Sequence, residues 1–288
     1  LGRRIADTAE RGISIPQLEA LGRLVEEVVD ECDIYDNYGE VQTWETINLY
    51  TINVYFVKVL TGEYRCSFVE LVAEGDQTPL WFVSHWWGTP FRQTLRMVAF
   101  HAETRSCKAK FYWLCTVANN QHCLEELGGL LADTPFMRVL NSTSCIGTVA
   151  CMDSKATPFT RIWCVLELYQ STARAPGSAK TSHLYDIAAW VAPATQRYGG
   201  KRVPEQAALR LDVSPGSTGR EIVEYPDSGG WFPDEVAMCG VETDVSKATA
   251  SVDADRRIIM AYVHGKEQDM NTMIHQCFCE GAMTHCAR

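Results

Sequence analysis

The spacing of hydrophobic positions changes along the chain, and each change marks an expected element of secondary structure. Within residues 1–35 the apolar positions after Pro16 recur at helical spacing, which predicts a helix in this part. Residues 44–60 are apolar and rich in Ile, Val and Tyr. Periodicity does not decide between helix and strand for this run, but its length favours a second helix.

From residue 78 onward, short apolar runs alternate with segments of helical spacing. The runs have the length of buried strands and cover 81–84, 110–117, 145–152 and 182–191. Helical spacing occupies 91–102, 134–140 and the segment that contains Trp163 and Glu167. This alternation favours a parallel sheet with helices on both faces, and therefore an α/β fold.

The two ends of the chain differ from this alternating part. Residues 193–235 are rich in Gly, Pro and Ser and are expected to form a long loop, whereas 244–264 and 269–280 return to helical spacing. We therefore expect three parts. They are a helical N-terminal extension over 1–77, an α/β core over 78–192, and a loop-rich insertion with C-terminal helices over 193–288 that packs on the core.

Composition narrows the classes of function. The 288 residues carry a formal net charge of −10, which disfavours nucleic acid or an anionic membrane surface as the main partner. No apolar run approaches the roughly 20 residues that span a bilayer. The twelve cysteines are scattered without a CxxC pair, which favours free thiols in the cytoplasm or another reducing compartment. Cysteines and histidines near the C-terminus match no common zinc spacing, so no metal site is expected.

Three places next to the expected strands carry residues suited to a ligand. They are Ser-His-Trp-Trp-Gly at 84–88, Ala-Asn-Asn-Gln-His at 118–122, and the start of the helix with Trp163 and Glu167. Ligands of open parallel sheets bind beyond the carboxyl ends of the strands, so these residues are expected to gather at one edge. Their aromatic faces, amides and carboxylate suit a nucleotide or another flat, polar ligand. In the alternative interpretation, the tryptophans pack in the core, the asparagines form turns and the histidines have a structural role.

Glu167 interrupts the otherwise apolar segment Ile-Trp-Cys-Val-Leu-Glu-Leu at 162–168. On a helix it falls on the flank of the apolar stripe and on the same side as Trp163. A buried carboxylate without a partner is costly. Glu167 is therefore expected either to pair with Arg161 or His85, or to have a functional role.

The sequence Trp-Cys-Val-Leu-Glu-Leu at 163–168 resembles the W-C-x-x-E-L signature of TIR domains, flavodoxin-like α/β domains seen in plant immune receptors. Residues 82–85 are similar to the first TIR strand and 136–150 to the second helix and third strand, so the resemblance covers 78–192. The strings SHWWG and ANNQH also resemble large algal and protist families with no assigned activity. At 85–88 the chain has His-Trp-Trp-Gly, where TIR domains usually have an acidic or Arg-Gly stretch.

The resemblance implies an enzyme that cleaves the ribose–nicotinamide bond of NAD⁺, with Glu167 in the position of the catalytic carboxylate. NAD is then the substrate, and no tightly bound cofactor is expected. The residues expected to contact the nucleotide lie at the end of the first strand, in the loop after the second strand, and one turn before Glu167: Ser84, His85, Trp86, Asn119, Asn120 and Trp163.

Many TIR domains are adaptors without activity, so two other functions stay open. One is a non-catalytic module for self-association or binding of partner proteins, or a subunit of a larger assembly, in which Glu167 is an ion-pair partner. The other is a nucleotide binder that cleaves nothing. Glu167 partly exposed at the floor of a pocket would favour the enzyme, whereas Glu167 in a buried salt bridge would favour the scaffold.

Overall fold

A computed structural model describes residues 2–108, 110–123, 130–172, 183–191, 206–213, 220–223 and 232–282 of the chain. The chain divides into two compact units. Unit 1 comprises Leu1–Val83 and Trp87–Ile146, and unit 2 comprises Ser84–Trp86 and Gly147–Arg288.

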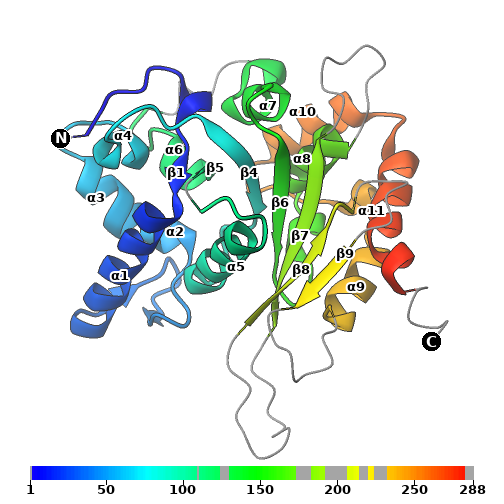
Figure 1. Ribbon diagram of the computed structural model, residues 1–288, viewed down its shortest axis with the longest axis horizontal. Coiled ribbons are helices and arrows are strands. Elements are labelled where there is room, and N and C mark those ends of the chain that lie inside the picture. Colours follow the sequence, from blue (N-terminus) through cyan, green and yellow to red (C-terminus); the bar gives the residue numbers. More distant parts are fainter. Residues whose placement is uncertain are drawn as a thin grey trace, which may run out of the picture. The chain divides into compact units, whose positions relative to one another are not determined.

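Unit 1 combines strands with many short helices (Figure 1). Its strands are β1 (Ile13–Ser14), β2 (Ile34–Tyr35), β3 (Val41–Gln42), β4 (Pro79–His85), whose last two residues belong to unit 2, and β5 (Phe111–Trp113). Its helical segments are η1 (Thr8–Glu10), α1 (Ile15–Glu31), α2 (Leu49–Ile52), η2 (Asn53–Val57), α3 (Lys58–Thr61), α4 (Phe68–Val72), α5 (Phe91–Thr104), α6 (Cys115–Ala118), η4 (Leu131–Asp133) and α7 (Pro135–Asn141).

The strands of unit 1 are ordered β1-β5-β4, with β2 and β3 forming a separate antiparallel pair. β4 and β5 run parallel, with Trp81 opposite Tyr112 and Phe82 opposite Trp113, while β1 is antiparallel to β5. The amide of Ile146 donates to the Leu80 carbonyl of β4 at 2.9 Å. Unit 1 therefore contains a parallel strand pair, as the alternating pattern predicted.

Local sequence signals begin the helices of unit 1. Ser14 and Gln17 form a capping box at the start of α1, and Ser67 and Glu70 form a second one at the start of α4. Asn48 caps α2, and the helix then continues through the π-helical turn η2 into α3. The helix expected within 44–60 is thus present, although it begins only at residue 49.

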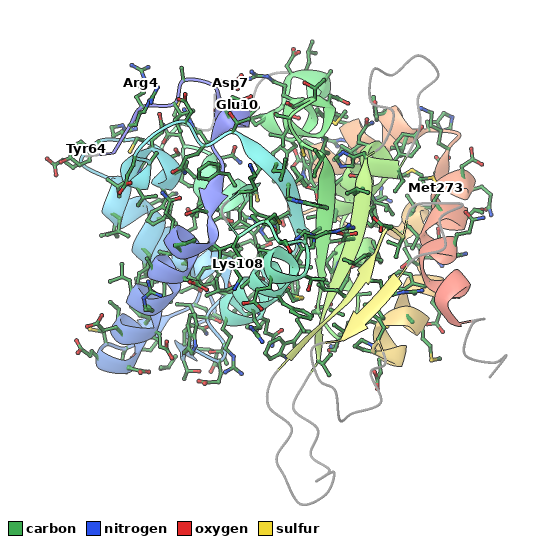
Figure 2. All side chains as sticks on the ribbon, in the orientation of Figure 1. Arg4, Asp7, Glu10, Tyr64, Lys108 and Met273 are labelled. Carbon is green, nitrogen blue, oxygen red and sulfur yellow. The ribbon has the colours of Figure 1, made fainter. Side chains whose placement is uncertain are left out.

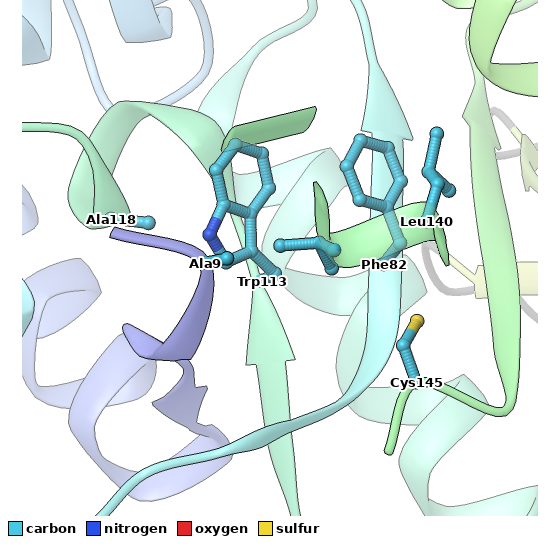
Figure 3. Packing of buried hydrophobic residues seen from close by; sticks show 7 residues of the cluster. Ala9, Phe82, Trp113, Ala118, Leu140 and Cys145 are labelled. Atoms are coloured by element: carbon cyan, nitrogen blue, oxygen red, sulfur yellow. The ribbon is translucent and has the colours of Figure 1, made fainter. Parts of the chain in front are cut away.

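Aromatic rings from β4 and β5 pack within a buried hydrophobic cluster of unit 1 (Figure 3). Phe82 of β4 and Trp113 of β5 stack with ring centroids 5.3 Å apart, and Phe136 of α7 meets Trp113 edge-on at 5.2 Å. The buried indole N–H of Trp113 donates to the Thr8 carbonyl at 2.9 Å, which satisfies the one polar atom of the ring. This packing fixes the start of the chain against the sheet.

Unit 2 contains the strands β6 (Gly147–Met152), β7 (Leu184–Val191), β8 (Gln206–Leu211) and β9 (Arg220–Val223), in that order across the sheet. β6 and β7 are parallel, whereas β8 and β9 add antiparallel strands. Its helical segments are η5 (Thr157–Thr160), α8 (Ile162–Thr172), α9 (Asp234–Val241), η6 (Val245–Lys247), α10 (Asp253–Val263) and α11 (Glu267–Ala282).

Helices α9 and α11 of unit 2 pack against each other at Gly240. A Cβ atom built at this glycine would lie 2.2 Å from the Phe278 ring, so the close approach of the two helices requires glycine. Phe278 is itself fully buried and meets Phe159 edge-on.

The α/β class is confirmed: parallel strand pairs alternate with helices, in agreement with a flavodoxin-like fold. Some expected elements differ. The strand expected over 110–117 ends at Trp113 and gives way to α6, and 244–264 divides into η6 and α10. The long loop expected over 193–235 is wrong at 206–211 and 220–223, which form strands, and its remaining parts lie mostly outside the described residues. The division into 1–77, 78–192 and 193–288 stays a prediction.

In the described part of the chain, no helix is both long and apolar enough to cross a membrane. The nine cysteines whose side chains the structure describes are free thiols.

Candidate functional site

Ser84 and Glu167 meet inside unit 2, at the carboxyl end of β4. The Ser84 hydroxyl donates a hydrogen bond of 2.5 Å to Glu167 Oε2, and the two residues are 1% and 6% exposed. Strand β4 positions the serine, while α8 turns the glutamate inward because Ile162, Val165 and Leu166 bury the adjoining face of the helix. The structure thus joins two residues that lie 83 positions apart in the sequence.

Burial raises the pKa of the Glu167 carboxyl from its ordinary value of 4.5 to about 8. Hydrogen bonds from Ser84 and Cys164 oppose this shift, because they stabilise the charged form, but desolvation dominates. The partners of the carboxyl are neutral side chains and not a cation. Glu167 is therefore mostly protonated near pH 7.

The backbone of β4 and the start of α8 complete the surroundings of this carboxyl. Cys164 lies beside both sides, and its one S–H can donate either to the Glu167 carboxyl or to the His85 carbonyl 3.5 Å away. His85 is buried and Trp86 is half-buried. Of the residues singled out in the sequence, Ser84 thus contacts Glu167 directly and His85 contacts the neighbouring Cys164.

Trp163 is half-buried, and its indole N–H donates to Asp255 of α10 at 3.0 Å. One of the partners expected for Glu167, Arg161, instead donates to Thr249 and Ser251. These bonds attach the start of α8 to the segment around α10. Trp163 therefore anchors the helix that presents Glu167.

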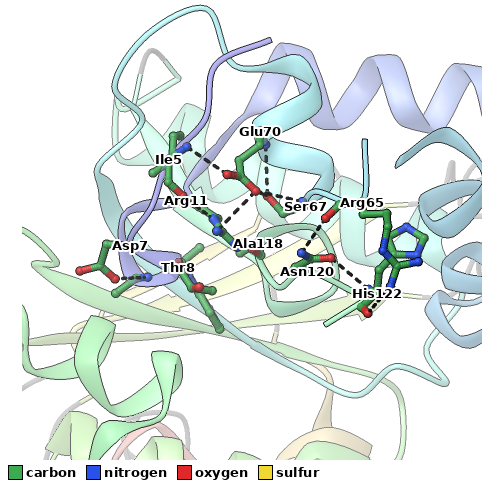
Figure 4. Close-up of polar contacts among 12 residues, drawn as sticks. Ile5, Asp7, Thr8, Arg11, Arg65, Ser67, Glu70, Ala118, Asn120 and His122 are labelled. Carbon is green, nitrogen blue, oxygen red and sulfur yellow. Dashed lines mark hydrogen bonds and ion pairs between the residues drawn. The ribbon is translucent and has the colours of Figure 1, made fainter. Parts of the chain in front are cut away.

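Asn119 and Asn120, the other residues singled out, belong to unit 1. Asn120 donates to the Arg65 carbonyl at 2.8 Å and accepts from the His122 amide at 3.0 Å (Figure 4). Asn119 follows α6, and its side-chain oxygen is buried without a hydrogen-bond partner among the described residues. Burial, together with the charges of Arg65 and Lys58, lowers the pKa of His122.

Sequence reasoning overlooked a buried ion pair in unit 1, between Arg11 and Glu70. The guanidinium lies 3.4 Å from the carboxylate, and the side chains are 4% and 6% exposed. A signal was present in the sequence, because Glu70 interrupts the apolar run 68–72 much as Glu167 interrupts 162–168. Both glutamates are buried, but only Glu70 has a charged partner.

In the described ranges, no group of three or more His, Cys, Asp and Glu side chains is arranged to hold a metal ion. His275 bonds to the Thr243 carbonyl at 3.1 Å, while the side chains of Cys277 and Cys279 lie outside the described residues.

Comparisons of the chain with protein-family models, curated proteins and solved structures found no significant match.

Proposed function

We propose that the chain is a TIR-like hydrolase or cyclase that cleaves the ribose–nicotinamide bond of NAD⁺, with Glu167 as the carboxylate that faces the ribose. The observation that carries the proposal is the Ser84–Glu167 pair, a buried carboxyl with neutral partners at the carboxyl end of a parallel strand. In α/β sheets this edge is where ligands bind.

Cleavage breaks the bond between the anomeric carbon and the pyridinium nitrogen, and nicotinamide leaves with the bonding electron pair. Positive charge then develops on the ribose, and an ionised Glu167 next to it lowers the energy of that state. In hydrolysis, water adds to the anomeric carbon and passes a proton to the Glu167 carboxylate. Ser84 orients this carboxylate through its hydrogen bond.

The raised pKa of Glu167 fits this role. A cationic nicotinamide ring close to the carboxyl favours its charged form, so binding of NAD⁺ lowers the pKa that burial has raised. A glutamate already paired with arginine would have its charge compensated before the substrate arrived. Only 6% of Glu167 is exposed, so the partial exposure expected of an enzyme is not met, and NAD⁺ has to displace some of the surrounding side chains on binding.

The test is NAD⁺ turnover by the purified chain at high concentration with a crowding agent, beside Glu167→Gln. We expect nicotinamide release to fall at least about a hundredfold in the variant, because the neutral amide does not stabilise the cationic transition state. In the unmodified chain kcat/KM should rise as the pH passes through about 8 and level off above it, since the ionised carboxyl is the active form.

Glu74→Gln, a change at an exposed glutamate of unit 1, is the matched control and should keep full turnover. Equal rates for the chain and Glu167→Gln would contradict the proposal. The absence of nicotinamide release from a correctly folded chain would do the same.

Self-association is the second candidate function, favoured by an apolar face on unit 1. Tyr50 and Val54, and likewise Tyr55 and Val59, are spaced four residues apart on the helix formed by α2, η2 and α3, and 37% to 68% of each residue is exposed. The order Tyr, Val, Tyr, Val is self-complementary: an antiparallel second copy would place each tyrosine opposite a valine. A two-fold interface needs this kind of matching.

Sedimentation of the chain over a range of concentrations tests this candidate. We expect a dimer that dissociates at least about tenfold more readily in Val59→Asp, because a carboxylate would be buried in the contact. Val252→Asp, a change at an exposed valine of unit 2, is the control. A chain that stays monomeric at all concentrations, or an unchanged dimer in Val59→Asp, would exclude this face as the interface.

A further inference from the structure

Unit 1 contains a cavity of about 370 Å³ that is independent of Glu167 and its partners. Its size falls within the range of small-molecule sites. Tyr64 and Arg4 lie at the surface of the unit (Figure 2). The full lining is Gly2, Arg4, Ala6, Arg11, Tyr64, Arg65, Cys66, Glu70 and Asn120.

Positive charge dominates this lining. Three guanidinium groups face one carboxylate, and Arg11 is the group that pairs with that carboxylate. Burial and the nearby Glu70 raise the pKa of the Cys66 thiol, so the thiol is neutral. Arg4 and Arg65 therefore supply excess positive charge in a chain whose net charge is −10.

The N-terminal segment is held in place next to Arg4 by the buried Glu70, whose contacts with Ile5 and Ser67 are drawn in Figure 4. One oxygen of this carboxylate accepts from the Ile5 amide at 3.1 Å, and the other accepts from the amide and hydroxyl of Ser67, both at 3.0 Å. Arg11 donates to the Ile5 carbonyl at 2.8 Å. Gly2 packs closely on α4, the helix that contains Glu70. A Cβ atom at residue 2 would lie 2.4 Å from the Glu70 carbonyl oxygen. The first residues therefore form a fixed side of the cavity.

Arg65 also lines the cavity, and its backbone has a conformation that favours glycine. Its φ is +47°, which costs a non-glycine residue on the order of 1 kcal/mol. Its carbonyl accepts from Asn120, and its side chain donates to the His122 carbonyl at 3.2 Å. The backbone bonds would serve glycine equally well. An arginine at this strained position is therefore a candidate for function.

We propose that this cavity binds a small metabolite that bears a phosphate or carboxylate group, with Arg4 and Arg65 holding the oxyanion. Guanidinium groups are suited to both oxyanions because they donate two parallel hydrogen bonds. The exposed ring of Tyr64 offers an apolar surface to the rest of the metabolite.

Calorimetric titration of the full chain with inorganic phosphate, and separately with acetate, tests this proposal at constant ionic strength. We expect saturable binding that weakens at least about tenfold in Arg4→Ala and in Arg65→Gly. The melting temperature of Arg65→Gly should not fall, because glycine relieves the backbone strain, so lost binding cannot be attributed to unfolding. Arg23→Ala, a change at an exposed arginine of α1, should bind as the unmodified chain does.

Tighter binding of phosphate would support a phosphate ester as the natural ligand, and tighter binding of acetate would support a carboxylic acid. The proposal is overturned if neither anion gives a saturable heat. It is equally overturned if all variants, including Arg23→Ala, bind alike.

Discussion

The folded chain is expected to lose stability as the pH rises from about 4.5 to about 8, and Glu167→Gln is expected to remove most of that loss. The unfolded chain releases the Glu167 proton near pH 4.5, whereas the folded chain keeps it until about pH 8. Between these values the folded state binds more protons, so the free energy of unfolding falls as the pH rises. Above about pH 8 this contribution is complete and amounts to roughly 3 to 5 kcal/mol.

Denaturant unfolding of the chain and of Glu167→Gln, followed across this pH range, measures the effect. The free energies of unfolding of the two proteins should differ least at the acidic end of the range. There the Glu167 carboxyl of the unmodified chain is protonated in both the folded and the unfolded state. At the alkaline end Glu167→Gln should be the more stable protein, because its amide stays neutral and still accepts the Ser84 hydrogen bond. If the free energy of unfolding changes with pH in the same way for both proteins, Glu167 ionises near its ordinary pKa. The proposal that bound NAD⁺ shifts this carboxyl to its charged form would then be contradicted.

Glu70→Gln is expected to destabilise the chain by about 3 to 5 kcal/mol, because it leaves the buried Arg11 guanidinium without its counter-charge. Glutamine has the same shape and can still serve as the third residue of the α4 capping box. The substitution therefore removes the charge and, if the amide oxygen faces Ser67, also the hydrogen bond that Glu70 accepts from the Ile5 amide. The free energy of unfolding from denaturant titration at neutral pH measures it.

Ser67→Ala is the control, since it removes the cap of the same helix and one hydrogen bond to Glu70 but leaves both charges of the ion pair in place. It should cost about 1 kcal/mol, the usual value of an N-cap. If Glu70→Gln costs no more than Ser67→Ala, the ion pair contributes little and the N-terminal segment is held by backbone bonds alone. The double variant Arg11→Met with Glu70→Leu should recover much of the lost stability, because it removes both buried charges.

The sequence predicted the α/β class because buried parallel strands have a clear pattern. Strands β4, β6 and β7 are mostly apolar, and each lies where an apolar run was found in the sequence. Strands β8 and β9 were overlooked because Gly- and Pro-rich stretches surround them, although residues 207–209 of β8 are buried and apolar. Strand β1 has only two residues, which is too short for any period to appear.

Single residues of the candidate site could be predicted from local sequence patterns, but the contacts between them could not. A carboxylate on the flank of an apolar stripe marked Glu167, and the end of a buried strand marked Ser84, but only the fold brings them to 2.5 Å. The expected partner Arg161 is instead engaged by Thr249 and Ser251, residues far along the chain that no local pattern connects with α8. The cationic cavity depends in the same way on pairing of Arg11 with Glu70 across 59 positions, which no spacing rule reveals.

The π-helical turn η2 has a consequence for how this protein can evolve. Such a turn holds one residue more than a regular helix, and here the extra residue adds to the exposed face, while Ile52 and Val57 stay buried on the other. Deleting a single codon, for example that of Tyr55, would restore a regular helix and keep the buried residues in register. A single mutational step can therefore change this apolar surface while the buried residues beneath it keep their register.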